Sequence, residues 1–184
     1  MHRTFFGSFV VFLLVKPIQL LSLFEDKFLY QIISRITLSS LFVIAYYRLI
    51  GAINKLHGSL VSKCMTLVSL SQFHFIFYSS RTLPNTFALI LVILVYSAWL
   101  RQKWNTLIGL IAFTVLVVRF ETILLFGFIF LFEVFYTGNL SIYKILKVGI
   151  PIGFVCLIFT ILFDSYMWNK WIWPEGISNC VVLV

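Results

Sequence analysis

Charged residues are scarce in this chain of 184 residues: Asp, Glu, Lys and Arg make up 11% of it, and only six are acidic. A soluble globular domain carries about 25% charged residues. With 61% apolar residues, the chain cannot cover its own core with a surface that water wets. The scarcity of charge therefore excludes a cytosolic globular enzyme, a soluble secreted module and a disordered protein.

Cysteine is scarce too, with three residues that are not closely spaced. An odd number without close spacing predicts neither a disulfide framework nor a metal site. We expect Cys64 and Cys156, which lie inside apolar runs, to be packing residues. The sequence also has no phosphate-binding loop, zinc-ligand pattern or nucleophile elbow, and it predicts no cofactor.

The chain has many long apolar runs, and its mean hydropathy is +1.05. About 20 apolar residues cross the hydrocarbon of a bilayer as a helix. Strands are not expected, because alternating apolar and polar patterning is absent. The runs predict an all-α, polytopic transmembrane helical bundle. They are Thr4–Phe24, Phe28–Ile50, Ser59–Ser79, Thr86–Leu100, Trp104–Tyr136 and Val148–Trp168.

Two of these runs do not fit a simple crossing. Thr4–Phe24 contains Lys16-Pro17, a charge and a helix breaker near its middle. Trp104–Tyr136 would be roughly 50 Å long as one helix, and Arg119-Phe120-Glu121 stands near its centre. It is either one steeply tilted helix with a buried charge pair, or two short helices that turn at Arg119.

Basic residues fall mostly between the runs, so membrane topology explains the net charge of +8 better than a nucleic-acid partner does. If the long run folds as two helices, seven bases share the cytoplasmic side. They are Arg48, Lys55, Lys63, Arg101, Lys103, Lys144 and Lys147. The sequence thus predicts one incomplete domain over residues 1–184. Residues 1–27 are an interfacial element, 28–168 a bundle of about six spans, and 169–184 a tail on the far side.

Polar residues collect on that far side of the membrane. They are His74, Arg81, Asn85, Arg119, Glu121, Asp164 and the Trp-rich stretch 168–175. Ionisable groups at membrane depth usually face a bundle interior or a water-filled cavity. Two arginines in such a cavity suit a phosphate, because the guanidinium fork donates paired hydrogen bonds.

Each of these residues also has a purely structural interpretation. Arg119 and Glu121 could simply pair with each other at a helix break. Asn85 could be the N-cap of a helix that begins at Thr86, after Pro84 has ended the preceding one. His74 could be a hydrogen-bonded core residue one turn before Tyr78. The tryptophans could form an aromatic belt.

One long segment resembles a signature of a known family. The run Ser80-Arg81-Thr82-Leu83-Pro84-Asn85-Thr86, within Phe73–Leu89, is similar to that of glycosyltransferase family 22, the mannosyltransferases that depend on dolichyl phosphate mannose. Supporting segments stand in the expected order. They are Arg3-Thr4-Phe5-Phe6-Gly7, Arg119-Phe120-Glu121, Asp164-Ser165-Tyr166-Met167-Trp168 and Trp173-Pro174-Glu175-Gly176.

The resemblance implies a GT-C fold in the endoplasmic reticulum membrane, with its active face toward the lumen. It implies transfer of mannose from dolichyl phosphate mannose to an oligosaccharide on dolichyl pyrophosphate, most similar to the branch that forms alpha-1,6 linkages. By analogy, Arg81 and Arg119 contact the donor phosphate, and Glu121 and Asp164 organise the site. His74 and Asn85 are the remaining substrate-binding candidates.

The chain departs from the family pattern at both ends. The acidic lumenal loop that supplies the catalytic base is expected before Met1, so no catalytic residue is assigned here and the chain alone is expected to be inactive. Alternatives are an alpha-1,2 or glycosylphosphatidylinositol-anchor mannosyltransferase of the same family, or a non-catalytic membrane subunit. A transporter is disfavoured, because repeated halves with paired half-helices are absent.

Overall fold

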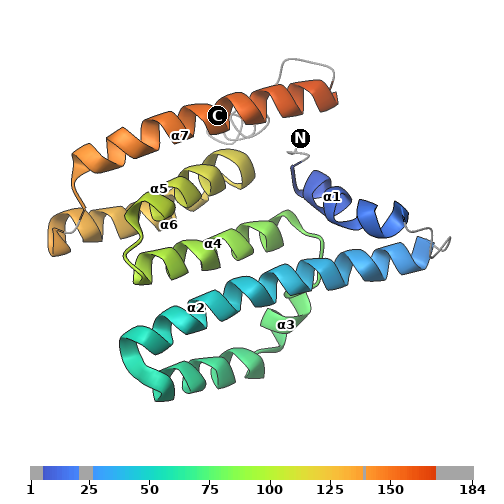
Figure 1. The fold of residues 1–184 in the computed structure, drawn as a ribbon, viewed down its shortest axis with the longest axis horizontal. Coiled ribbons are helices and arrows are strands. Elements are labelled where there is room, and N and C mark those ends of the chain that lie inside the picture. The colour runs from blue at the N-terminus through green and yellow to red at the C-terminus, as the bar shows by residue number, and fades with distance from the viewer. Residues whose placement is uncertain (1–5, 21–26, 139, 169–184) are drawn as a thin grey trace, which may run out of the picture. The chain divides into compact units, whose positions relative to one another are not determined.

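The computed structural model describes residues 6–20, 27–138 and 140–168, and the regular elements of these ranges are all helices joined by short turns (Figure 1). No strand occurs within them, so the all-α prediction is confirmed for this part of the chain. The chain forms two compact units, one covering Gly7–Gln102 and the other built mainly from Lys103 onward. The single domain expected over residues 1–184 remains a prediction.

The Gly7–Gln102 unit is built around α4 and the part of α2 before Gly58, which lie side by side and run in the same direction (Figure 1). Its helices are α1 (Phe6–Leu20), α2 (Lys27–Ser71), α3 (Phe73–Ser79) and α4 (Pro84–Leu100). One apolar stripe recurs every three or four residues of α2, the spacing that keeps side chains on one helix face. The stripe is Leu38, Phe42, Ala45, Leu49 and Ile53, and it packs on Ile90 and Ile93 of α4.

A sharp break divides α2 at Gly58, whose φ of 85° and ψ of 172° are not helical. This conformation is essentially restricted to glycine, because a Cβ would clash with the backbone. We expected a loop between Ile50 and Ser59, and that expectation is wrong: the helix continues to His57 and turns at Gly58. The expected run Ser59–Ser79 is also interrupted, because α2 ends at Ser71 and the extended Gln72 precedes α3.

Helix α1 passes through Lys16-Pro17 without ending there. Pro17, which the sequence offered as a helix breaker, therefore does not end this helix. A proline inside a helix removes one main-chain hydrogen bond, a loss that membrane helices tolerate when neighbouring groups satisfy the freed carbonyl. α1 has 15 residues, and its position at the membrane surface stays a prediction.

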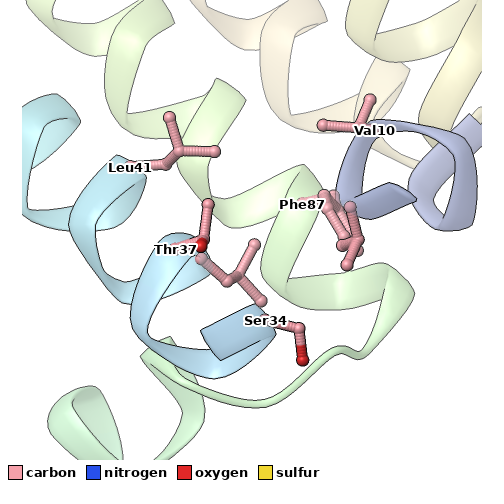
Figure 2. A pocket seen from close by; sticks show the side chains of 7 residues that line it. Val10, Ser34, Thr37, Leu41 and Phe87 are labelled. Carbon is pink, nitrogen blue, oxygen red and sulfur yellow. The ribbon is translucent and has the colours of Figure 1, made fainter. Parts of the chain in front are cut away.

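A small apolar pocket lies where α1, α2 and α4 approach one another (Figure 2). Val10 and Val11 of α1, Phe87 of α4, and four residues of α2 line it: Ser34, Thr37, Leu38 and Leu41. Gly7 brings α1 close to α4, because a Cβ at Gly7 would lie 3.1 Å from the Phe87 ring. The Thr37 hydroxyl donates to the Ile33 carbonyl of its own helix at 2.8 Å, so the lining offers packing rather than recognition.

The unit from Lys103 onward contains a chain reversal at Arg119. Its elements are α5 (Trp104–Phe113), the π-helix η1 (Thr114–Val118), α6 (Thr122–Leu131), the π-helix η2 (Phe132–Thr137) and α7 (Ile142–Trp168). Arg119 is extended, with φ of −155° and ψ of 112°, and α6 runs back from it (Figure 1). Of the two alternatives for Trp104–Tyr136, two helices that turn at Arg119 is therefore confirmed.

Small residues bring α7 close to α5 and η1. A Cβ added at Gly149 would lie 3.5 Å from Ile108, and one at Gly153 would lie 3.6 Å from Leu116. Small residues four apart let membrane helices approach closely, where van der Waals contact replaces the hydrophobic effect as the main attraction. The third contact of this kind is at Gly109, 3.5 Å from Ile152.

Two helical segments of the described ranges, Phe28–Ser71 and Ile142–Tyr166, are long and apolar enough to cross a membrane. Three shorter apolar segments accompany them: Asn85–Leu100, Trp104–Val118 and Thr122–Thr137. Helices of this shorter kind fall below the usual 20 or so residues of a span. The helices fit a membrane protein, and the number of six spans remains a prediction.

Candidate functional site

Arg81 lies in the short loop between α3 and α4. The loop follows the end of α3 at Ser79 and ends at Pro84. Pro84 begins α4 because its fixed φ suits the first turn of a helix. The Arg81 side chain is exposed and its guanidinium carbon stands 4.6 Å from the centre of the Phe77 ring. This cation–π contact orients the guanidinium without using its hydrogen-bond donors.

Asn85 is not an N-cap, which corrects the structural interpretation of that residue. The capping position is Leu83, in extended conformation and without a side-chain cap bond, and Asn85 lies exposed in the first turn of α4. The residue that joins the two helices is Thr86, which is 2% exposed and donates from Oγ1 to the Tyr78 carbonyl at 3.2 Å. In the sequence, the sign of this contact is a threonine that stands two residues after the proline that begins a helix.

His74 is exposed on α3 rather than buried in the core, so the core interpretation is wrong. Its ring centre is 6.4 Å from that of Tyr78 and 6.3 Å from that of Phe73. Phe75, its neighbour in sequence, anchors α3 instead, through an edge contact of 4.8 Å with Phe42 of α2. His74 at the start of α3, Arg81 in the loop and Asn85 at the start of α4 are thus all exposed.

Arg119 and Glu121 form a salt bridge of 2.9 Å between Nη1 and Oε2. Their side chains are 38% and 70% exposed, respectively. The pairing interpretation is thus confirmed, and it is compatible with a ligand, because a guanidinium has five N–H donors. The turn itself is held by main-chain and side-chain bonds: Arg119 N donates to the Thr114 carbonyl, and Thr122 Oγ1 to the Arg119 carbonyl.

Two acidic side chains of this unit are buried. Asp164 of α7 is 1% exposed and Glu133 of η2 is 5% exposed. Thr137 donates from Oγ1 to the Glu133 carboxylate, one helical turn away. Sequence reasoning selected Asp164 and missed Glu133, although an acidic residue inside an apolar run is itself a sign of a special environment.

The structure thus places the six candidates in two groups. His74, Arg81 and Asn85 stand at one end of α4, and Arg119, Glu121 and Asp164 belong to the unit from Lys103 onward. Their union in one site remains a prediction. The stretch 169–175 and the side chain of Trp168 lie outside the described residues, and with them the aromatic belt.

The cysteines and the possible metal ligands of the described residues provide no further candidate for either group of site residues. Cys156 is buried, as expected of a packing residue, whereas Cys64 is exposed and that expectation is wrong. Within the described ranges, no three His, Cys, Asp or Glu side chains gather closely enough to hold a metal ion.

Comparison with known proteins finds one family. The Alg9-like mannosyltransferase family, glycosyltransferase family 22, matches residues 3–177. A relative from Drosophila melanogaster, named Dol-P-Man:Man(7)GlcNAc(2)-PP-Dol alpha-1,6-mannosyltransferase, is 36% identical over 95% of this chain and 26% of its own length. Relatives of the same name from Arabidopsis thaliana and Saccharomyces cerevisiae are 33% and 36% identical, over 94% and 59% of this chain and 35% and 20% of their own.

The chain therefore spans about a quarter to a third of the length of the first two relatives. No solved structure matches it.

Proposed function

Because the chain belongs to the Alg9-like mannosyltransferase family, we propose that it forms part of an enzyme that transfers mannose from dolichyl phosphate mannose to a seven-mannose glycan on dolichyl pyrophosphate, through an alpha-1,6 bond. One observation carries the proposal. The relatives from Drosophila and Arabidopsis bear the name of this activity and match the chain over 94% of its length or more. The alpha-1,2 and anchor-building alternatives gain no such support.

The chemistry explains why arginines are needed. An acceptor hydroxyl attacks the anomeric carbon of the donor mannose, the bond from that carbon to the phosphate oxygen breaks, and dolichyl phosphate leaves with one more negative charge. A general base takes the proton of the hydroxyl. Cationic donors that are already in place stabilise the charge that develops on the departing phosphate. We assign this role to Arg81 and Arg119, whose exposed guanidiniums are each oriented by one neighbour.

Glu121 and Asp164 have supporting roles in this proposal. Glu121 fixes the direction of the Arg119 guanidinium through its salt bridge, without itself touching the phosphate. Asp164, buried on α7, organises the polar interior near the site. His74 and Asn85, both exposed, are candidates for contacts to the sugars.

The proposal includes a location. The reaction takes place at the lumenal face of the endoplasmic reticulum membrane, in a GT-C bundle of about six spans that binds its dolichol-linked donor and acceptor from the bilayer. We propose that the reaction uses no separate cofactor, because the donor supplies both the mannose and the leaving group. Apolar helices and the names of the relatives support this arrangement.

Mannose transfer in microsomes tests the proposed function. The protein that contains these 184 residues is expressed in cells that lack the endogenous alpha-1,6 enzyme, and labelled dolichyl phosphate mannose is supplied. We expect the seven-mannose precursor to become an eight-mannose precursor, and the new residue to be released by an alpha-1,6-specific mannosidase. Extension that only an alpha-1,2-specific mannosidase reverses would overturn the linkage, and absence of any extension would overturn the activity.

A further inference from the structure

The far end of α4 carries a feature that mannose transfer does not use: the side chain of Arg101 reaches across to α2. Arg101 Nη2 donates a hydrogen bond of 2.8 Å to the main-chain carbonyl of Arg48. The same carbonyl accepts a bond of 3.2 Å from Ser97 Oγ, one turn earlier in α4. The guanidinium is held in one place by this bond, although Arg101 remains exposed.

Gly51 leaves room for that guanidinium on the surface of α2. A Cβ at Gly51 would lie 3.5 Å from Arg101 Nη2. Arg48 and Lys55 stand seven residues apart, which puts both on the same face of the helix, with Gly51 between them. Their Cα atoms are about 10 Å apart at the helical rise of 1.5 Å per residue. Arg48, Lys55 and Arg101 therefore form a group of three exposed cations, which we call the basic site.

No carboxylate of the same unit's described residues compensates the basic site. From Lys27 to Gln102 the sequence has seven Lys and Arg residues and not one Asp or Glu. The screening length at physiological salt is about 8 Å, close to the spacing of these residues, so salt weakens the repulsion between their charges without removing it. An anion bound between the three cations would remove the rest, and no described residue of the unit supplies one.

Aromatic residues beside the basic site indicate where the membrane surface lies. Tyr47, next to Arg48, is 77% exposed, and Tyr96 and Trp99 form an edge contact of 6.1 Å in the last turns of α4. Tyrosine and tryptophan collect at the boundary between hydrocarbon and headgroups. An anion bound at that depth would be the headgroup of a lipid rather than a solute in bulk water.

We propose that Arg48, Lys55 and Arg101 bind the phosphate of an anionic glycerophospholipid such as phosphatidylinositol. The fixed guanidinium of Arg101 offers paired donors to the phosphate, and Lys55 adds a flexible point charge. The whole length of α4 separates this site from the loop that holds Arg81. The proposal thus concerns the opposite end of the helix, and it stands or falls independently of mannose transfer.

Native mass spectrometry of the purified protein that contains these 184 residues, in detergent, tests this inference. The protein is titrated with phosphatidylinositol or with phosphatidylcholine, and the apparent Kd of the first bound lipid is measured. We expect phosphatidylinositol to bind more tightly, and Lys55→Gln and Arg101→Gln each to weaken it about fivefold, the usual effect of one basic residue near an anionic surface. Arg35→Gln is the matched control, because Arg35 is an exposed arginine of the same helix, 13 residues before Arg48, and should bind as the unchanged chain does.

Each other outcome contradicts the proposal. Equal binding of the two lipids would show that the protein does not select an anionic headgroup. Equal weakening in the Arg35→Gln control would show that the lipid responds only to the net positive charge of the protein. Displacement of the lipid by millimolar inorganic phosphate would point to a soluble anion instead. If Arg101→Gln loses helicity by circular dichroism, Lys55→Gln decides the question, since no described contact of the fold depends on its side chain.

Discussion

Three arginines of this protein differ in the neighbour that holds the guanidinium in place. Arg81 rests on an aromatic ring, Arg119 is paired with Glu121, and Arg101 is bound to a carbonyl of another helix. The first two have neighbours within four residues along the chain, so their surroundings could be anticipated from the sequence. The third has its partner 53 residues away.

Replacement of Arg119 by glutamine should separate catalysis from stability. We expect Arg119→Gln to reduce mannose transfer about a hundredfold, the usual cost of removing one donor that stabilises developing charge. Glu121→Gln removes the same salt bridge but keeps the guanidinium, so its loss of activity should be smaller. Initial rates in microsomes at saturating acceptor measure both.

Stability provides the control for this pair. The bridge is 38% and 70% exposed at its two side chains, and pairs of this kind contribute about 0–1 kcal/mol. Both variants should therefore unfold within a few degrees of the unchanged protein. Large, equal losses of stability would show that the bridge holds the turn rather than the substrate.

Helices and turns were the most predictable level of the structure. The end of α4 at Leu100 and the reversal at Arg119 follow from local features: the end of an apolar run, and a charge pair inside one. The start of α4 at Pro84 lies two residues before the expected start at Thr86. The position of the break in α2 was not predicted. Several residues between Ile50 and Ser59 are polar, and only the backbone shows that Gly58 is the one that leaves the helix.

Two glycine-to-alanine substitutions test the role of that break. At Gly58, φ is 85° and a Cβ would meet nothing within 4 Å, so the cost of Gly58→Ala is conformational, about 1–3 kcal/mol. At Gly127, inside α6, a Cβ also meets nothing within 4 Å, and alanine should stabilise the helix by about 1 kcal/mol. Unfolding midpoints in mixed detergent should shift in opposite directions. A Gly58→Ala variant as stable as the unchanged chain would show that the turn does not need glycine.

At the scale of the molecule, close packing between helices stabilises each compact unit. In the unit from Lys103 onward, α7 meets α5 and η1 across Gly109, Gly149 and Gly153. Side chains larger than glycine would push these backbones apart, since membrane helices attract each other mainly through close contact.

Leucine at two glycine positions tests this packing. Gly153→Leu should destabilise the protein by about 1–3 kcal/mol, because its Cβ alone already stands 3.6 Å from Leu116. Gly127→Leu is the control, as the space around Gly127 is open. Thermal unfolding followed by circular dichroism measures both. An equal loss of stability in the two variants would mean that leucine destabilises the protein without disturbing the packing of α7 on η1.

Topology can be tested on the whole molecule by cysteine labelling. In a background without the natural cysteines, cysteines at positions 81 and 119 should react with an impermeant maleimide only when the lumenal side of microsomes is opened. Cysteines at positions 55 and 144 should react from outside in sealed vesicles, because the predicted orientation puts basic loops in the cytosol. Labelling of position 81 in sealed vesicles would reverse the orientation and remove the proposed site from the lumen.

The sequence by itself identified the helical class and the family of this protein, predicted a membrane environment, and offered the turn at Arg119 as one of two alternatives. These depend on composition, on the length of apolar runs and on motifs that a few neighbouring residues define. The tertiary structure decided the rest: the turn at Gly58, the burial of Glu133, the exposure of His74 and Cys64, and the contact from Arg101 to Arg48. The physical reason is that burial and long-range contact depend on which helix packs against which, and side chains far apart in the sequence make that choice together.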